Sequence, residues 1–301
     1  MSGETVEAWL RRAAGLLEAA GVDEPRFEAR LLLAGAAGWS AEAALAHRRE
    51  PLSDELARRA DRMLERRRQR QPASQILGTR EFWGLEFAVS PEVLDPRPDS
   101  ETLVSAALGG IGNRAAPLRV LDLGTGTGCL LLALLSELPN ARGLGVDVSP
   151  AAIRVAEANC LRLGLSSRAE LRIGNWGESL SERFDLIIAN PPYLSSEDIA
   201  GLQPEVARWE PRVALDGGAD GLDAYRKLMP EIARLLVNDG FAAVEIGWTQ
   251  AAAVKAICQV AGLAVRSCVR DLAGRERCLV IDHGVVGTEK NSWKNDVSRL
   301  G

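Results

Sequence analysis

The stretch Leu118-Arg-Val-Leu-Asp-Leu-Gly-Thr-Gly-Thr-Gly128 decides the fold of this 301-residue chain. Its apolar beginning, Leu118–Leu123, predicts a buried strand, and glycines follow at alternate positions, at Gly124, Gly126 and Gly128. Such glycines permit a tight turn and bring backbone amides close to a ligand at the N-terminus of the next helix. The spacing is not the Gly-x-Gly-x-x-Gly of dinucleotide enzymes, and no basic residue follows as in a P-loop. We interpret it as a nucleotide or nucleoside site, with a purely structural turn as the alternative.

Strands and helices alternate from Pro117 onward, and this alternation predicts a doubly wound, mainly parallel α/β sheet of seven strands. We expect strands at Leu118–Leu123, Leu144–Val148, Ala169–Ile173, Phe184–Ala189, Phe241–Ile246, Leu263–Val269 and Arg277–Ile281. We expect helices at Thr127–Leu138, Ser149–Leu163, Tyr225–Leu236 and Thr249–Ala261, and Asn238-Asp-Gly240 lies between the third helix and the strand that follows it. The last two strands have no helix between them, which indicates an antiparallel edge.

The N-terminal part of the chain shows helical periodicity from Val6 to about Arg70. Pro25 suits the first turn of a second helix, and Ser40 and Ser53 are suitable N-caps for two more. Between residues 71 and 98 the pattern changes to that of a short hairpin. We therefore expect an all-helical domain over residues 1–75, a β-hairpin linker over 76–97, an α/β domain over 98–283 and a disordered tail over 284–301.

The last predicted helix of the N-terminal domain is rich in arginine. It carries Arg58, Arg59, Arg62, Arg66, Arg67, Arg68 and Arg70. A run of this kind is usually a solvated helix face, and docking onto an acidic partner or a ribonucleoprotein is the alternative.

Composition limits the remaining classes of function. The net charge of -5 and the sequence pI of about 5.4 give no global positive field for nucleic acid. The five cysteines form no Cys-x-x-Cys pair and the chain has two histidines, so we expect reduced thiols and no metal site. The longest apolar run, Cys129–Leu135, is far shorter than the roughly 20 residues that span a bilayer. The first residues lack the apolar core of a signal peptide, so we expect a soluble cytoplasmic protein.

Asp147 follows the second predicted strand, about 20 residues after the glycine loop. A carboxylate at this point can accept hydrogen bonds from both ribose hydroxyls, as in the related dinucleotide fold. An aspartate after a strand is otherwise a common helix cap. Its pairing with the glycine loop favours a nucleoside site.

The tetrapeptide Asn190-Pro-Pro-Tyr193 follows the apolar strand Phe184–Ala189 directly. Its two prolines have no N–H and hold the chain extended, which leaves the Asn190 side chain and the Pro191 carbonyl free to face a ligand. Two oxygens placed in this way can accept both protons of an NH2 group and aim its lone pair at an electrophile. Tyr193 offers a flat face for stacking against a planar group. An ordinary Asn-Pro loop is the alternative.

The glycine loop, Asp147 and Asn190-Pro-Pro-Tyr193 together resemble the class I S-adenosylmethionine-dependent methyltransferases that act on exocyclic or amide nitrogen. That superfamily includes DNA adenine and rRNA guanine enzymes, so the tetrapeptide alone does not fix the substrate. Three further stretches, and the small helical domain, are similar to the bacterial peptide chain release factor glutamine N5-methyltransferases. These stretches are Leu94-Asp-Pro-Arg-Pro-Asp-Ser-Glu101, Glu210–Tyr225 and Asp271–Arg277, and the likeness runs from about residue 5 to 282.

The resemblance implies a Rossmann-like methyltransferase that methylates the side-chain amide nitrogen of a glutamine in the Gly-Gly-Gln loop of release factors. It assigns the cofactor, S-adenosylmethionine, to Gly124, Thr125, Gly126, Thr127, Gly128, Asp147, Trp176 and Asn190. It assigns catalysis and the grip on the glutamine amide to Asn190, Pro191, Pro192 and Tyr193. The helical domain is then a docking surface for the release factor, and we expect a monomer with no membrane contact and no stable nucleic-acid binding. Two departures from the family pattern are Asp95, which bears on packing in the linker, and Asn175, which bears on a detail of adenine contact.

Several alternatives stay open. Trp176 is either a cofactor contact or a core aromatic. Arg97 either forms a surface ion pair with Glu101 or Asp99 or has a structural or substrate-facing role at the mouth of the cleft. Glu245, at the end of the fifth strand, is left out of the catalytic set, with membership of a buried network as its alternative. The rival enzymes are an amino-methyltransferase of DNA or rRNA, with the arginine-rich helix as its basic patch, and a ribosomal-protein glutamine methyltransferase. A cofactor-binding adaptor without activity is the rival of another class.

Overall fold

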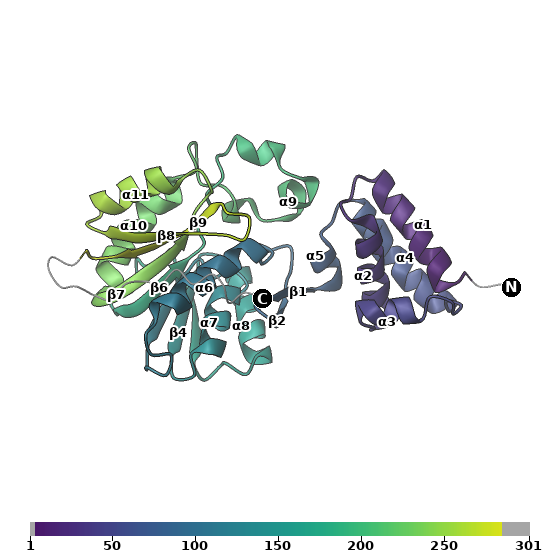
Figure 1. Cartoon of the computed structure of the whole chain (residues 1–301), viewed down its shortest axis with the longest axis horizontal. Coiled ribbons are helices and arrows are strands. Elements are labelled where there is room, and N and C mark those ends of the chain that lie inside the picture. The colour runs from purple at the N-terminus through teal and green to yellow at the C-terminus, as the bar shows by residue number, and fades with distance from the viewer. Residues whose placement is uncertain (1–3, 285–301) are drawn as a thin grey trace. The chain divides into compact units, whose positions relative to one another are not determined.

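The computed structural model describes residues 4–284, which form two compact units (Figure 1). A helical unit comprises the described chain up to Thr79, together with Val89–Pro91 and Leu202–Glu210. An α/β unit comprises Arg80–Ala88, Glu92–Gly201 and the described chain from Pro211 onward. Apart from Gly284, the tail expected over 284–301 lies outside the described residues.

The helical unit follows the pattern of its caps and apolar positions. Its helices are α1 (Val6–Ala19), α2 (Pro25–Ala37), α3 (Ala41–Ala46), α4 (Asp54–Arg68), α5 (Ala73–Leu77) and α9 (Pro204–Trp209). The hydroxyls of Ser40 and Ser53 accept hydrogen bonds from the first turns of α3 and α4, and Gly38 ends α2 at a φ of 71°. The fully buried Trp9 packs among leucines in the core of this unit.

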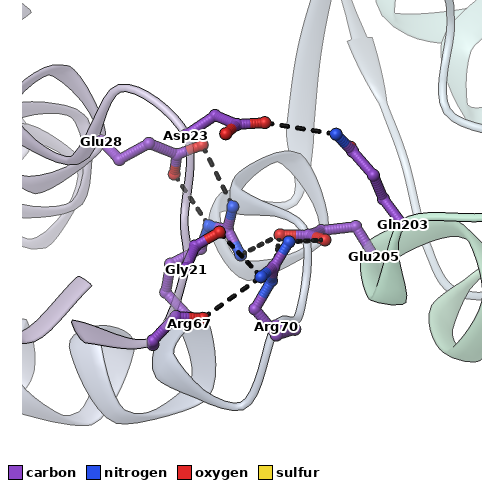
Figure 2. A network of polar contacts seen from close by, with 8 residues as sticks. Gly21, Asp23, Glu28, Arg67, Arg70, Gln203 and Glu205 are labelled. Carbon is purple, nitrogen blue, oxygen red and sulfur yellow. Dashed lines mark hydrogen bonds and ion pairs between the residues drawn. The ribbon is translucent and has the colours of Figure 1, made fainter. Parts of the chain in front are cut away.

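Helix α9 is held in the helical unit by two arginines of the arginine-rich stretch. Figure 2 shows the Arg67 and Arg70 guanidinium groups converging on the Glu205 carboxylate. Arg70 donates two hydrogen bonds of 2.6 Å to Glu205 and others to the Ala20 and Gly21 carbonyls at 3.1 and 2.8 Å. Arg67 donates to Glu28 at 2.9 Å, and its Nη1 lies 2.9 Å from Glu205 Oε1 outside hydrogen-bond geometry.

The environments of these arginines differ from those of the rest of the run. Arg67 is 4% exposed, so the solvated-face interpretation is wrong for this residue. The exposed members are Arg58, Arg59, Arg62, Arg66 and Arg68.

The segment Leu202–Glu210 lies within the expected α/β domain of residues 98–283, but in the structure it clusters with the helical unit. Its partners lie more than 130 residues away in sequence, beyond the reach of a local pattern.

The α/β unit contains a seven-stranded sheet within the described residues, in the order β5-β4-β3-β6-β7-β9-β8. The strands are β3 (Arg119–Leu123), β4 (Arg142–Asp147), β5 (Ala169–Ile173), β6 (Phe184–Ala189), β7 (Leu236–Glu245), β8 (Ala264–Arg270) and β9 (Glu276–Asp282). Strands β3 to β7 pair in parallel, and β9 pairs antiparallel with both β7 and β8. The predicted fold class and its antiparallel edge are confirmed.

Helices accompany the sheet as the alternation predicts (Figure 1). They are α6 (Glu101–Gly110), α7 (Cys129–Glu137), α8 (Pro150–Arg162), α10 (Asp223–Leu235) and α11 (Ala251–Val260). The strands β1 (Thr79–Phe82) and β2 (Leu85–Ala88) form the predicted hairpin. Its turn residues, Trp83 and Gly84, have φ values of 55° and 69°, as a two-residue hairpin turn requires.

Strand β7 begins at Leu236, earlier than the expected start at Phe241, so the strand also includes Asn238-Asp-Gly240. Phe184 pairs with Leu236, but Leu186 pairs with Phe241, so the extra residues form an irregularity inside the strand. Gly240 permits it because a Cβ there would lie 2.8 Å from the Asp185 carbonyl oxygen. The strand therefore tolerates a turn-forming sequence without breaking.

The reversal of strand order positions the site. The chain runs from β3 outward to β4 and β5, and then returns to pair β6 on the other side of β3. Ligand crevices of open α/β sheets lie at the carboxyl ends of the strands beside such a reversal. The glycine loop after β3, Asp147 at the end of β4 and Asn190 after β6 all lie at this edge.

Candidate active site

A cavity of about 760 Å³ opens at this edge of the α/β unit. The predicted site residues that line it are Gly124, Gly126, Asp147, Trp176, Asn190 and Pro192. They come from the ends of four strands, β3, β4, β5 and β6, so the structure brings the separate motifs of the sequence to one place.

The glycine loop has the backbone shape that its sequence requires. Gly124, Gly126 and Gly128 have φ values of 80°, 55° and 79°, in the region that favours glycine. The Gly126 amide donates a hydrogen bond of 2.9 Å to Asp147 Oδ2, and the Ser149 amide donates one of 2.9 Å to Asp147 Oδ1. Asp147 therefore joins the loop to the start of α8, as a helix cap would, and it also lines the cavity, as a ligand-binding residue would.

Three residues that the resemblance assigns to the cofactor serve the loop itself and do not line this cavity. The buried Thr125 donates a hydrogen bond of 2.7 Å to Asp122 Oδ2. The Thr127 side chain accepts from the Cys129 amide at 3.3 Å, and a Cβ on Gly128 would lie 3.3 Å from Ala156. Their contact with a cofactor stays a prediction.

Asp122, at the end of β3, is a fully buried carboxylate. Burial raises its pKa to about 7, although the hydrogen bond from Thr125 lowers it. Its Oδ1 has no hydrogen-bond partner among the described residues. Asp122 does not line the cavity, so its carboxylate supports the glycine loop from below through Thr125.

Trp176 is both a core aromatic and a wall of the cavity. Its backbone has a φ of 50°, and its half-buried ring packs against the core of the α/β unit. A Cβ on Gly124 would lie 3.3 Å from this ring, which explains why the first glycine of the loop has no side chain. The flat indole beside the loop offers a stacking surface for a planar base.

The tetrapeptide after β6 is split between cavity and interior. Asn190 and Pro192 line the cavity, whereas Pro191 is buried. Asn190 Nδ2 donates a hydrogen bond of 3.2 Å to Ser100 Oγ, and the Tyr193 hydroxyl donates one of 3.4 Å to Glu245 Oε1. Burial raises the pKa of Tyr193, so this phenol stays protonated. Stacking of Tyr193 on a substrate stays a prediction.

The backbone of the tetrapeptide is clamped by residues that the sequence analysis did not select. Gln250 Nε2 donates to the Tyr193 carbonyl at 2.9 Å and to the Gly221 carbonyl at 3.3 Å. A Cβ on Gly217 would lie 2.8 Å from the Pro192 carbonyl oxygen, and one on Gly221 would clash with the Tyr193 carbonyl. The stretch Glu210–Tyr225 therefore carries glycines because it packs directly on this backbone.

The other two resemblance stretches meet behind the tetrapeptide. Ser100 and Asp99 belong to the first stretch, and Arg277 belongs to the second. Arg277 is 5% exposed and pairs with Asp99 and Asp271 at 3.1 Å each. The sequence analysis does not select Ser100, although it lies within the stretch Leu94–Glu101, and nothing in the sequence near Gln250 signals its contact with the tetrapeptide.

Residues 4–284 contain neither a candidate membrane-spanning helix nor a candidate metal cluster. No helix in this part of the chain combines the length and the apolar character needed to cross a membrane. In the same residues, no group of three or more histidine, cysteine, aspartate or glutamate side chains is arranged to hold a metal ion.

Comparison with known families and proteins agrees with this geometry. The family model described as "PrmC N-terminal domain" matches residues 8–78, and the one described as "Methyltransferase domain" matches residues 115–295. The chain is 47% identical to a release factor glutamine methyltransferase of Rhodospirillum rubrum, over 92% of this chain and 85% of the relative. It is 46% identical to the protein of the same name from Cereibacter sphaeroides, over 89% and 95%.

A solved structure gives an independent view of the fold. The catalytic domain of hMettl16, solved with the MAT2A 3′UTR hairpin 6, superposes with a TM-score of 0.57 at 17% identity, covering 72% of this chain and 83% of that one. At this identity the likeness establishes the methyltransferase fold alone.

Proposed function

This chain belongs to the release factor glutamine methyltransferase family, and from that membership we propose that it methylates a glutamine of peptide chain release factors. The target is the side-chain amide nitrogen of the glutamine in their Gly-Gly-Gln loop. The observation that carries the proposal is the place of Asn190. It lines the same cavity as Asp147 and the glycine loop, at the carboxyl end of β6.

The residues at the cavity fit S-adenosylmethionine. Asp147 would accept from the ribose hydroxyls, the backbone of Gly124 and Gly126 would border the amino acid part, and Trp176 would stack beside the adenine. When bound, the cofactor supplies a methyl group on a sulfonium. The close packing of Trp176 on Gly124 suits a ligand with a flat base.

Asn190 and the Pro191 carbonyl orient the glutamine amide. Each accepts one N–H of the substrate, which draws the nitrogen lone pair out of conjugation and toward the methyl group. Methyl transfer would form a carbon–nitrogen bond as the carbon–sulfur bond of the cofactor breaks, and the methylated nitrogen would then release one proton to water.

The helical unit is proposed as the docking surface for the rest of the release factor. A protein substrate must deliver one side chain into the cavity, so it needs a second contact area. The arginines Arg58, Arg59 and Arg62 are exposed on α4 and offer positive charge to an acidic surface.

The test is methyl transfer from labelled cofactor to purified release factor, with rRNA and duplex DNA as competing substrates. We expect label on the release factor only, and none when its loop glutamine is changed to alanine. Asn190→Ala should lower the rate by roughly tenfold to a thousandfold, because it removes one acceptor from the reacting amide. An unchanged rate in Asn190→Ala would remove Asn190 from the mechanism.

A further inference from the structure

A buried carboxylate lies behind the tetrapeptide. Glu245 ends β7 and is 1% exposed. Its Oε1 accepts from the Tyr193 hydroxyl at 3.4 Å, and the Ser100 hydroxyl hydrogen bonds to the same carboxylate. Its Oε2 is buried and meets no partner at strict hydrogen-bond geometry among the described residues. Burying a carboxylate with so few partners costs free energy, which indicates a role besides packing.

Hydrogen-bond direction links this carboxylate to the site. An ionised carboxylate only accepts hydrogen bonds, so the Ser100 hydroxyl must donate its hydrogen to Glu245. Ser100 Oγ is then an acceptor toward its other neighbour, the Asn190 side chain at 3.2 Å. Only the NH2 group of Asn190 satisfies an acceptor, so the amide oxygen of Asn190 is left for the cavity.

We propose that Glu245 is a positioning residue whose carboxylate, acting through the Ser100 hydroxyl, fixes the Asn190 amide with its oxygen toward the cavity. This inference rests on the proposed function, because that oxygen is the acceptor that grips the glutamine amide. An Asn190 side chain turned the other way presents NH2 to the substrate NH2, and two donors repel. The hydrogen-bond chain from Glu245 through Ser100 to Asn190 therefore selects the productive one of the two flipped orientations of the Asn190 amide, which occupy nearly the same space.

The link depends on the ionised form of Glu245. Burial raises the pKa of Glu245 to about 7, with the Ser100 hydrogen bond and Arg277 acting in the opposite direction. A protonated carboxyl can also donate, so below this pKa the chain no longer has a single direction. The titratable and charged groups around Glu245 are Asp99, Cys129, Tyr193, Tyr225, Arg277 and Cys278. Loss of activity below about pH 7 is the expected consequence.

The experiment compares Glu245→Gln, Ser100→Ala and the double variant in the full-length protein, with release factor as the substrate. Glutamine matches the shape of glutamate but can donate to Ser100 and reverse the chain. Each single variant should lower kcat roughly tenfold, the value of one oriented hydrogen bond, while the dissociation constant for S-adenosylmethionine stays within about twofold. The double variant should be no slower than the slower single variant, because both break the same chain.

Tyr225→Phe is the matched control. The Tyr225 hydroxyl donates to the backbone carbonyl of Glu245 at 3.0 Å and takes no part in the directed chain. It should lose stability but keep kcat within about twofold. In the wild type, kcat should fall as the pH drops through about 7. This low-pH limb of the pH–rate profile should be absent in Ser100→Ala.

Wild-type kcat in folded Glu245→Gln, or additive losses in the double variant, overturns the inference. If Glu245→Gln does not fold, the test rests on Ser100→Ala. A Ser100→Ala protein that keeps the wild-type kcat and the wild-type fall of kcat at low pH overturns the inference. A wild-type protein that leaves the release factor glutamine unmodified contradicts the proposed function instead, so the two failures are distinct.

Discussion

The backbone amide of Gly126 donates a hydrogen bond of 2.9 Å to Asp147 Oδ2, across 21 residues of sequence. The ends of β3 and β4 are thereby joined at the cavity wall. One carboxylate thus holds the glycine loop in shape and faces the space where a ribose would lie. This relationship gives the first prediction, because the loop and the ligand contact depend on the same side chain.

Asp147→Asn should weaken S-adenosylmethionine binding by roughly tenfold to a hundredfold, since an amide replaces one acceptor for the ribose hydroxyls. Isothermal titration calorimetry measures this directly. The matched control is Asp185→Asn, whose carboxylate accepts from the Arg119 amide at 2.7 Å at the opposite end of β3. Equal affinities in wild type and Asp147→Asn would show that Asp147 is a structural cap only.

Glu205→Gln should destabilise the protein by about 1–3 kcal/mol, because it leaves the buried Arg67 with less compensating charge. Burial of Glu205 opposes its ionisation, but hydrogen bonds from Arg70 and the positive charge of Arg67 outweigh burial and lower its pKa. A lowered pKa contributes stability above the unfolded pKa, and that contribution disappears as the pH falls through the folded pKa. The difference in free energy of unfolding between the variant and wild type should therefore become smaller at acidic pH.

Urea unfolding at neutral pH and near pH 4 measures this gap. The control is Glu65→Gln, which removes the exposed pair with Arg68 and should change the free energy of unfolding by less than about 0.5 kcal/mol. A gap that stays constant with pH would mean that the charge of Glu205 is irrelevant to stability.

Glu245→Gln should gain stability relative to wild type as the pH rises from about 5 to 8. The raised pKa of Glu245, about 7, means that the folded protein favours the protonated form. Wild type therefore loses stability as the pH rises from the unfolded value through about 7, whereas glutamine does not titrate. Thermal unfolding of both proteins at pH 5 and pH 8 tests this, and a pH-independent difference in midpoint contradicts it.

Arg58→Glu with Arg62→Glu should raise KM for release factor by roughly tenfold, because both arginines are exposed on α4 and reversal repels an acidic partner. The dissociation constant for S-adenosylmethionine should not change. The control reverses two exposed charges of the α/β unit, Arg154 and Lys255. Steady-state kinetics at two salt concentrations completes the test, and equal KM values in both variants would place docking elsewhere.

Local sequence was sufficient for the sheet and for the motifs at its edge. Gly124, Asp147 and Asn190 each follow an apolar strand, so the parallel pairing that brings strand ends together also predicts their meeting. The start of β7 was predicted too late, because pairing of Leu236 with Phe184 of β6 extends the strand back through Asn238-Asp-Gly240.

What could not be predicted depends on contacts between distant residues. The sequence near Glu205 does not predict its ion pairs with Arg67 and Arg70. The sequence near Glu245 does not predict its hydrogen bond with Ser100. In each case the partners lie more than 130 residues apart, and tertiary packing alone joins them. Arg67 shows the limit of a local view, because it lies on the buried face of α4 with Ala60 and Leu64, although other arginines of the run are exposed.

The central claim is the identity of the methylated atom. The most direct measurement is to incubate the protein with S-adenosylmethionine and full-length release factor, and then to map the modified residue by fragmentation mass spectrometry. The account predicts one added methyl group on the side-chain amide nitrogen of the glutamine in the Gly-Gly-Gln loop. A methyl group found on another residue, or on nucleic acid with the release factor unmodified, contradicts it.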